Sequence, residues 1–84
     1  MDPKEIEKLI ELGIAGANVR VSSADNTHYA VVVVSAEFAG QRAIARHQMI
    51  YRTLGPRMGN EIHALSIRAY TPEEWHELAA ENGN

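Results

Sequence analysis

The spacing of hydrophobic residues changes along the chain and predicts a succession of helices and strands. Near the start, the apolar positions recur every three or four residues, as in a helix with one buried face: Ile6, Leu9, Ile10 and Ile14. Asp2 is placed to cap this helix, and Pro3 suits its first position. Gly13 and Gly16 are expected to end it.

Two strands are expected next, because the pattern changes to alternation. Residues 17–23 alternate apolar with polar side chains, which indicates a half-buried strand. Residues 24–27, Ala-Asp-Asn-Thr, have the composition of a turn. Residues 28–35 are β-branched on both faces, which is typical of a central strand. The short connection predicts that the two strands form an antiparallel hairpin.

The second half of the chain repeats the change from helix to strand to helix. Residues 41–54 return to helical spacing, and residues 55–60 contain two glycines and a proline around a short helical turn. Residues 61–70 are predicted to form the third strand. A Thr-Pro start with a capping-box glutamate opens a last helix over residues 71–83. Its apolar side includes Trp75, which is expected to anchor the core.

This order of elements, α-β-β-α-(short α)-β-α, predicts the fold class. We expect an α+β two-layer sandwich with a three-stranded mixed sheet. If the second and third strands are parallel neighbours, the crossover between them stacks its helices on one face of the sheet. At 84 residues the chain is long enough for one domain, over residues 1–84, with an ordered core at about residues 2–80.

Composition excludes several classes of function. The chain has no cysteine, so it offers no disulfide, no thiol nucleophile and no thiolate ligand, and a metal must bind through His, Asp or Glu. No Ser/His/Asp arrangement or carboxylate pair is visible, and we expect a protein that is not an enzyme. No apolar run is long enough to span a membrane. The charged opening segment does not resemble a signal peptide, which predicts a cytoplasmic protein.

Charge is distributed unevenly along the chain. The net charge is −3, yet residues 40–70 hold five arginines against one glutamate. This basic segment is either a solvated helix surface or a docking patch for an anionic partner or nucleic acid. Its candidate phosphate-binding residues are Arg42, Arg46, Arg52 and Arg57. The GXXG clamp and interleaved aromatic residues of many RNA-binding proteins are missing.

Two histidines are candidates for metal ligation. His28 begins the second predicted strand, and His63 begins the third. Parallel neighbouring strands start at the same end of a sheet, so the two histidines would lie at the same edge, about 5 Å apart in backbone terms. Imidazole binds zinc, copper and iron, but two histidines are half a site at best. Structural hydrogen bonding for His63, and a polar strand start for His28, remain alternatives.

Several motifs, in this order, resemble those of the BolA-like family. They are His-Tyr followed by V-V-V-S, F-x-G, R-H on the middle helix, I-H-A-L-S-I, and T-P-x-E-W. Together they run from about Val19 to Trp75, and the preceding helix also fits. The short hairpin and the I-H-A-L-S-I-R-A-Y-T-P ending are most similar to the small bacterial branch. The resemblance implies a class II KH-like fold.

The resemblance also implies a partner and a cofactor. BolA-like proteins pair with monothiol glutaredoxins and share a [2Fe–2S] cluster, held on the other side by the glutaredoxin cysteine and glutathione. The histidine of the third strand maps onto His63, and the isolated chain would bind no cluster tightly. The family's second ligand is usually a Cys or His in a longer loop. Here that loop has neither, and His28 is the nearest substitute, with Asp25 as a weaker one.

Three functional hypotheses follow. The leading one is a non-enzymatic adaptor in iron–sulfur cluster assembly or transfer, or in iron-linked regulation. Histidine ligation would raise the reduction potential of the cluster and make binding sensitive to pH. The second is a DNA-binding transcriptional regulator that uses the basic segment. The third is a module that acts through protein contacts alone, and a weak homodimer is a further alternative.

Overall fold

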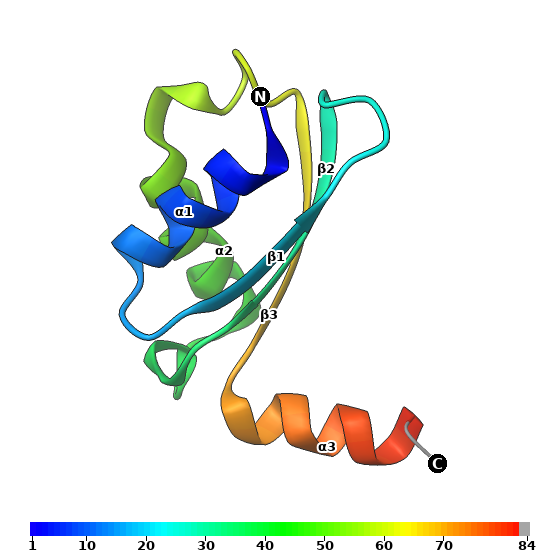
Figure 1. The fold of residues 1–84 in the computed structure, drawn as a ribbon. Helices are drawn as coiled ribbons and strands as arrows, with labels where there is room; N and C mark the ends of the chain where they lie inside the picture. The colour runs from blue at the N-terminus through cyan, green and yellow to red at the C-terminus, as the bar shows by residue number, and fades with distance from the viewer. Residues whose placement is uncertain (83–84) are drawn as a thin grey trace.

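The computed structural model describes residues 1–82 and has the predicted order of elements (Figure 1). The last two residues of the predicted domain, and the last residue of the predicted final helix, lie outside this range. The elements are α1 (Pro3–Gly13), β1 (Asn18–Ser22), β2 (His28–Val34), the 3₁₀ turn η1 (Ala36–Phe38), α2 (Ala43–Leu54), the 3₁₀ turn η2 (Gly55–Arg57), β3 (Ala64–Tyr70) and α3 (Pro72–Asn82). Among the described residues, none of these helices is long and apolar enough to cross a membrane.

The sheet has three strands in the order β1-β2-β3, with β2 at the centre. β2 pairs with β1 as the predicted antiparallel hairpin and with β3 in parallel, which confirms the mixed sheet. Residues 30–34 of β2 therefore have partners on both sides, whereas His28 and Tyr29 pair with β3 alone. Arg20 and Arg68, for example, flank Val32 in one row across the sheet.

The core lies between one face of the sheet and the two helices α1 and α2 (Figure 1). Its buried side chains come from every layer: Ile6, Ile10, Ile14, Val19, Tyr29, Val31, Val33, Phe38, Ile50, Leu54 and Ile62. The alternation of β2 places Tyr29, Val31 and Val33 toward the helices, and their neighbours toward the opposite face. The predicted two-layer architecture is confirmed.

Both edges of the sheet are partly closed by side chains from the helices. On β1, the backbone N–H of Val21 donates to Glu7 Oε2 over 3.0 Å. On β3, the carbonyl oxygen of Ala69 accepts from Arg46 Nη1 over 3.1 Å. Unpaired backbone groups on an edge strand are a template for pairing with another chain, so these contacts reduce that tendency.

Two predictions, the start of the third strand and the burial of Trp75, were wrong. The third strand begins at Ala64 rather than at residue 61, because Ile62 turns inward and is fully buried. Trp75 does not anchor the core: it is 41% exposed, and its ring lies 5.6 Å from that of Tyr70. α3 lies at the end of the sheet, away from α1 and α2 (Figure 1), so its apolar side meets the opposite sheet face.

Gly13 ends α1, as predicted, and also allows α1 to approach α2. A Cβ atom added at Gly13 would lie 2.4 Å from Thr53 Cγ2 and 2.9 Å from Thr53 Cβ. Because threonine is stiff at χ1, its side chain has little freedom to move away. A side chain at position 13 would therefore push the two helices apart.

We predict that Gly13→Ala lowers the stability of the protein. Alanine gains about 1 kcal/mol of helix propensity over glycine, whereas overpacking costs about 1–3 kcal/mol, so overpacking decides the sign. The free energy of unfolding, measured by urea titration, should fall. Glu11→Ala, at an exposed position of the same helix, should change it by less than about 0.5 kcal/mol. An equal or higher stability of Gly13→Ala would contradict the packing argument.

Candidate functional site

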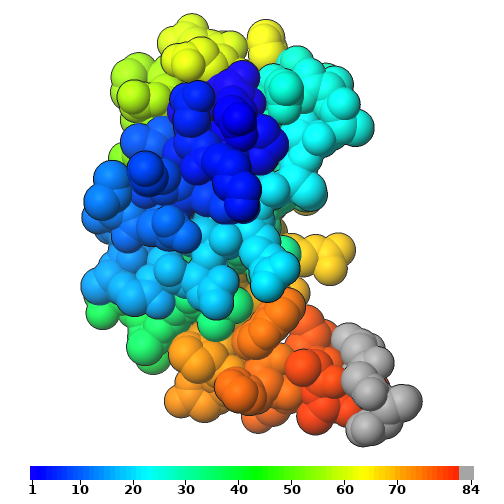
Figure 2. All heavy atoms as spheres, viewed as in Figure 1, coloured from blue at the N-terminus to red at the C-terminus, as the bar shows by residue number. Residues whose placement is uncertain are grey.

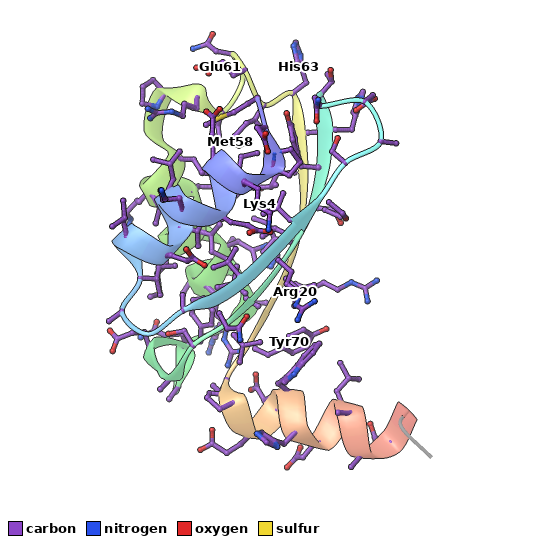
Figure 3. The ribbon with its side chains drawn as sticks, viewed as in Figure 1. Lys4, Arg20, Met58, Glu61, His63 and Tyr70 are labelled. Carbon is purple, nitrogen blue, oxygen red and sulfur yellow. The ribbon has the colours of Figure 1, made fainter. Side chains whose placement is uncertain are left out.

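His63 is exposed on a firmly held stretch of backbone at the end of the sheet. Its N–H donates to the carbonyl oxygen of Thr27 over 3.2 Å, and the preceding Ile62 is fully buried. The backbone of the loop before it is closed by hydrogen bonds from Gly59 N–H to Ile62 O and from Ile62 N–H to Arg57 O. The side chain points away from the body of the protein (Figure 3). The fold therefore presents an accessible imidazole from a fixed position.

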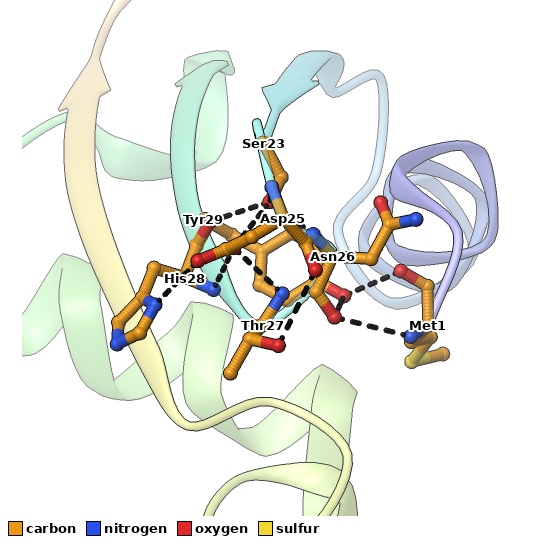
Figure 4. A network of polar contacts seen from close by, with 7 residues as sticks. All are labelled: Met1, Ser23, Asp25, Asn26, Thr27, His28 and Tyr29. Carbon is orange, nitrogen blue, oxygen red and sulfur yellow. Dashed lines mark hydrogen bonds and ion pairs between the residues drawn. The ribbon is translucent and has the colours of Figure 1, made fainter.

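His28 is held by Asp25 in the turn between β1 and β2 (Figure 4). Asp25 Oδ1 accepts the backbone N–H groups of Thr27 and His28 over 3.0 and 2.9 Å, and Asp25 Oδ2 lies 2.9 Å from His28 Nδ1. These hydrogen bonds, first from the His28 backbone, then from its ring and from the Thr27 backbone, lower the pKa of Asp25 well below its usual range. The carboxylate is therefore charged at neutral pH.

The contact with Asp25 determines which ring nitrogen of His28 is available. An ionised carboxylate only accepts hydrogen bonds, so Nδ1 carries the proton. In the neutral ring, Nε2 then has the free lone pair. A histidine that donates its other N–H to a carboxylate is the usual arrangement of metal-ligating histidines. The sequence predicts Asp25 only as a weaker substitute ligand, which misses this orienting role, although its position in a turn three residues before His28 is a signal for it.

The same turn is connected to the start of the chain through Tyr29 (Figure 4). The Tyr29 hydroxyl donates to the carbonyl oxygens of Asn26, over 2.5 Å, and Met1. Ser23 Oγ donates to the His28 carbonyl over 2.6 Å and accepts the N–H of Asn26 over 2.9 Å. Burial raises the pKa of the Tyr29 hydroxyl. This network fixes the conformation from which His28 projects.

The predicted meeting of His28 and His63 at one end of the sheet is confirmed for the backbone. His28 pairs with Ala64, the residue after His63. Within residues 1–82, no three His, Asp or Glu side chains come close enough to hold a metal ion. The site therefore consists of two exposed histidines at one end of the sheet, open to groups from another molecule.

Arg46 is not available for nucleic acid, which corrects its prediction as a candidate phosphate-binding residue. Its side chain is only 12% exposed, and its guanidinium binds Glu74 through two hydrogen bonds of 2.6 and 3.1 Å. Arg46 also donates to the carbonyl oxygens of Gln41 and Ala69 and lies 5.8 Å from the ring centre of Phe38. It connects α2, β3 and α3, so its role is structural.

The other three candidate arginines are separated from one another. Arg42 is the exposed N-cap of α2, and Arg52 is exposed in the last turn of the same helix. Arg57 lies in η2 and is half-buried beside Glu5 and Glu61. The structure therefore distributes these charges along the helical layer rather than in one compact patch.

Comparison with known proteins agrees with this fold. A sequence model described as BolA-like protein matches residues 14–74. The DNA-binding transcriptional regulator BolA of Vibrio cholerae is 42% identical over 62 residues, which cover 74% of this chain and 58% of that protein. The acid stress protein IbaG of Escherichia coli is 37% identical over 79 residues, 89% of each chain. The chain belongs to the BolA-like family.

Solved structures lead to the same conclusion about the fold. The structure of a bolA protein homologue from Coxiella burnetii has a TM-score of 0.76 and 38% sequence identity, and covers 90% of this chain and 97% of that one. The chain spans about half the length of the curated regulators named BolA, 48–58%.

We predict that Glu74 stabilises the protein in a pH-dependent way. Hydrogen bonds from Arg46, and then from the Thr71 backbone, lower the pKa of Glu74 from 4.5 to about 2. A carboxyl group whose pKa is lower in the folded state stabilises it fully above the unfolded-state pKa, and loses this effect as the pH falls toward the folded-state pKa. The melting temperature of the wild type should therefore exceed that of Glu74→Gln above pH 4.5, and the difference should vanish near pH 2.

Glu73→Gln is the matched control for this prediction, because Glu73 lies in the same turn and forms no ion pair among the described residues. Its melting temperature should follow that of the wild type at each pH. A difference between wild type and Glu74→Gln that does not change with pH would contradict the proposed origin of the stabilisation.

Proposed function

We propose that this protein is a non-enzymatic adaptor that binds a monothiol glutaredoxin and shares a [2Fe–2S] cluster with it and with glutathione. It acts in the assembly or transfer of iron–sulfur clusters, or in iron-linked regulation. The observation that carries the proposal is the exposed His63 on a firmly held backbone, at the same end of the sheet as the oriented ring of His28. Membership of the BolA-like family supports it.

The donor set of the chain fits one side of such a cluster. Imidazole pairs ligate one iron of some [2Fe–2S] centres, while thiolates hold the other iron. The chain has no cysteine, so the thiolates must come from the partner and from glutathione. His63 is the main donor, and His28 Nε2 is the second. When bound, the cluster would supply electron transfer, or iron and sulfide for delivery.

Asp25 has an orienting role in this proposal rather than a ligating one. Both of its oxygens are already engaged, Oδ1 by two backbone N–H groups and Oδ2 by His28 Nδ1. It keeps the His28 proton on Nδ1 and leaves Nε2 free for iron. Loss of such a partner typically weakens metal affinity about 10–100-fold.

The test is a titration of cluster-loaded monothiol glutaredoxin, in the presence of glutathione, followed by visible absorption and circular dichroism. The wild-type protein should change the spectrum, and His63→Ala should abolish the change. His28→Ala and Asp25→Asn should weaken it, Asp25→Asn less. His76→Ala is the control, because His76 is exposed on α3 and should leave the titration unchanged. An identical response from His63→Ala would reject the ligand assignment.

A second candidate function is DNA binding, which the name of the Vibrio cholerae relative favours. The residues that support it are the exposed Arg42 and Arg52, with Arg57 nearby in sequence. Each phosphate contact contributes about −0.9 to the slope of log affinity against log salt on duplex DNA. Arg42→Ala and Arg52→Ala should each reduce that slope by about 1 in an anisotropy titration. Lys4→Ala is the control, because Lys4 is exposed on α1 and should leave the slope unchanged. An unchanged slope for both arginine variants would reject this function.

A further inference from the structure

The sheet face opposite α1 and α2 has a composition that, apart from His28, the proposed function does not use. The outward-facing residues of the three strands form this outer face: Asn18, Arg20, Ser22, His28, Ala30, Val32, Val34, Ala64, Ser66, Arg68 and Tyr70. None of them is acidic, although the protein has a net charge of −3. The outer face is therefore a cationic surface on an acidic protein.

The two arginines of the outer face are aligned and unpaired. Arg20 and Arg68 are both exposed and lie on either side of Val32 in one row of the sheet. Two strand spacings separate their backbones, about 10 Å. Neither forms an ion pair among residues 1–82. Their guanidinium groups are thus free to bind an anionic ligand.

Aromatic rings border this row on one side. In the next row, Asn18, Val34 and Tyr70 are paired, and the Trp75 ring leans against Tyr70 at an interplanar angle of 47°. Trp75 also lines a hollow of about 350 Å³ with Asn18, Arg20, Val32 and Val34. Figure 3 shows Arg20 and Tyr70 on this side of the sheet, and Figure 2 shows the surface hollowed between the β1–β2 hairpin and α3.

We propose that the outer face binds single-stranded nucleic acid, with phosphates on Arg20 and Arg68 and a base stacked on Trp75. An open sheet face that carries aromatic rings is a known platform for unpaired bases, and arginines beside it bind the backbone. Duplex DNA does not fit this chemistry, because its bases are already stacked on one another. The proposal does not depend on the cluster or on the arginines of α2.

The acidic residues of α3 determine where the backbone of the bound nucleic acid can lie. Glu77 and Glu81 line a shallow hollow with Tyr70 and Leu78, on the side of β3 that also contains Arg46 and Glu74. Their charges repel phosphates. The backbone of the nucleic acid should therefore run over the Arg20–Arg68 row, with its bases directed toward Trp75.

The intrinsic fluorescence of the protein provides a direct test, because Trp75 is its only tryptophan. Oligo(dT) should quench this fluorescence on binding, since stacking brings a base onto the indole. Two phosphate contacts on a single strand correspond to a salt slope of about −1.4, so affinity should fall roughly sevenfold between 50 and 200 mM salt. A duplex of the same length and inorganic polyphosphate should not quench.

Variants assign the binding to the outer face. In anisotropy titrations with labelled oligo(dT), Arg20→Ala/Arg68→Ala should remove most of the salt dependence, and Trp75→Ala should weaken binding roughly tenfold. Trp75→Phe keeps an aromatic ring and should restore much of the affinity. Lys4→Ala, at an exposed position of α1, is the control on the helical layer and should bind like the wild type. Circular dichroism of each variant checks that it is folded.

Three results would overturn the inference. They are a preference for the duplex, equal quenching by poly-glutamate, which would indicate an acidic protein segment, and wild-type binding by the Arg20→Ala/Arg68→Ala variant. The last of these, together with a loss in Arg52→Ala, would place nucleic acid on α2 and favour the second candidate function instead. The glutaredoxin titration is unaffected by any of these outcomes, so the two proposals fail separately.

Discussion

The parallel pairing of β2 with β3 is the constraint on which the rest of the structure depends. It aligns His28 with Ala64, and so brings His63 to the same end of the sheet. It also requires a crossover, and α2 lies in that crossover and covers the core together with α1 (Figure 1). Because strand pairing fixes side-chain alternation, it also determines which residues face away from the helices. Both candidate surfaces follow from this one register.

Two charged contacts maintain this arrangement where hydrophobic packing does not. Asp25 holds the turn that precedes β2. Arg46 binds the Ala69 carbonyl near the end of β3 and the Glu74 carboxylate, and so connects the sheet to α3. α3 makes little contact with the core, so a paired charge rather than burial determines its position. A capping box between Thr71 and Glu74 starts the helix as predicted, and the same Glu74 carboxylate binds Arg46. One side chain thus both begins α3 and attaches it.

The two functional surfaces differ in chemistry. In the proposed function, the end of the sheet offers imidazole nitrogens to a cluster whose other ligands come from the partner and from glutathione. In the further proposal, the outer face offers guanidinium groups and aromatic rings to a flexible polyanion. His28 lies on the outer face and at its end, so it is the point where the two surfaces meet. Ligands of the two surfaces could therefore influence each other through the position of this one ring.

Sequence alone determined the order of elements, the mixed sheet and the family, because periodicity, caps and motifs are local signals. It also predicted that His28 and His63 lie at the same end of the sheet, since neighbouring parallel strands start together. Tertiary structure alone decided which charges are paired: Arg46 is bound to Glu74, 28 residues away, whereas Arg20 and Arg68 form no ion pair within residues 1–82. It also placed Trp75 on the outer face of the sheet, although the sequence predicts this residue in the core. Such contacts join distant segments, and local spacing carries no information about them.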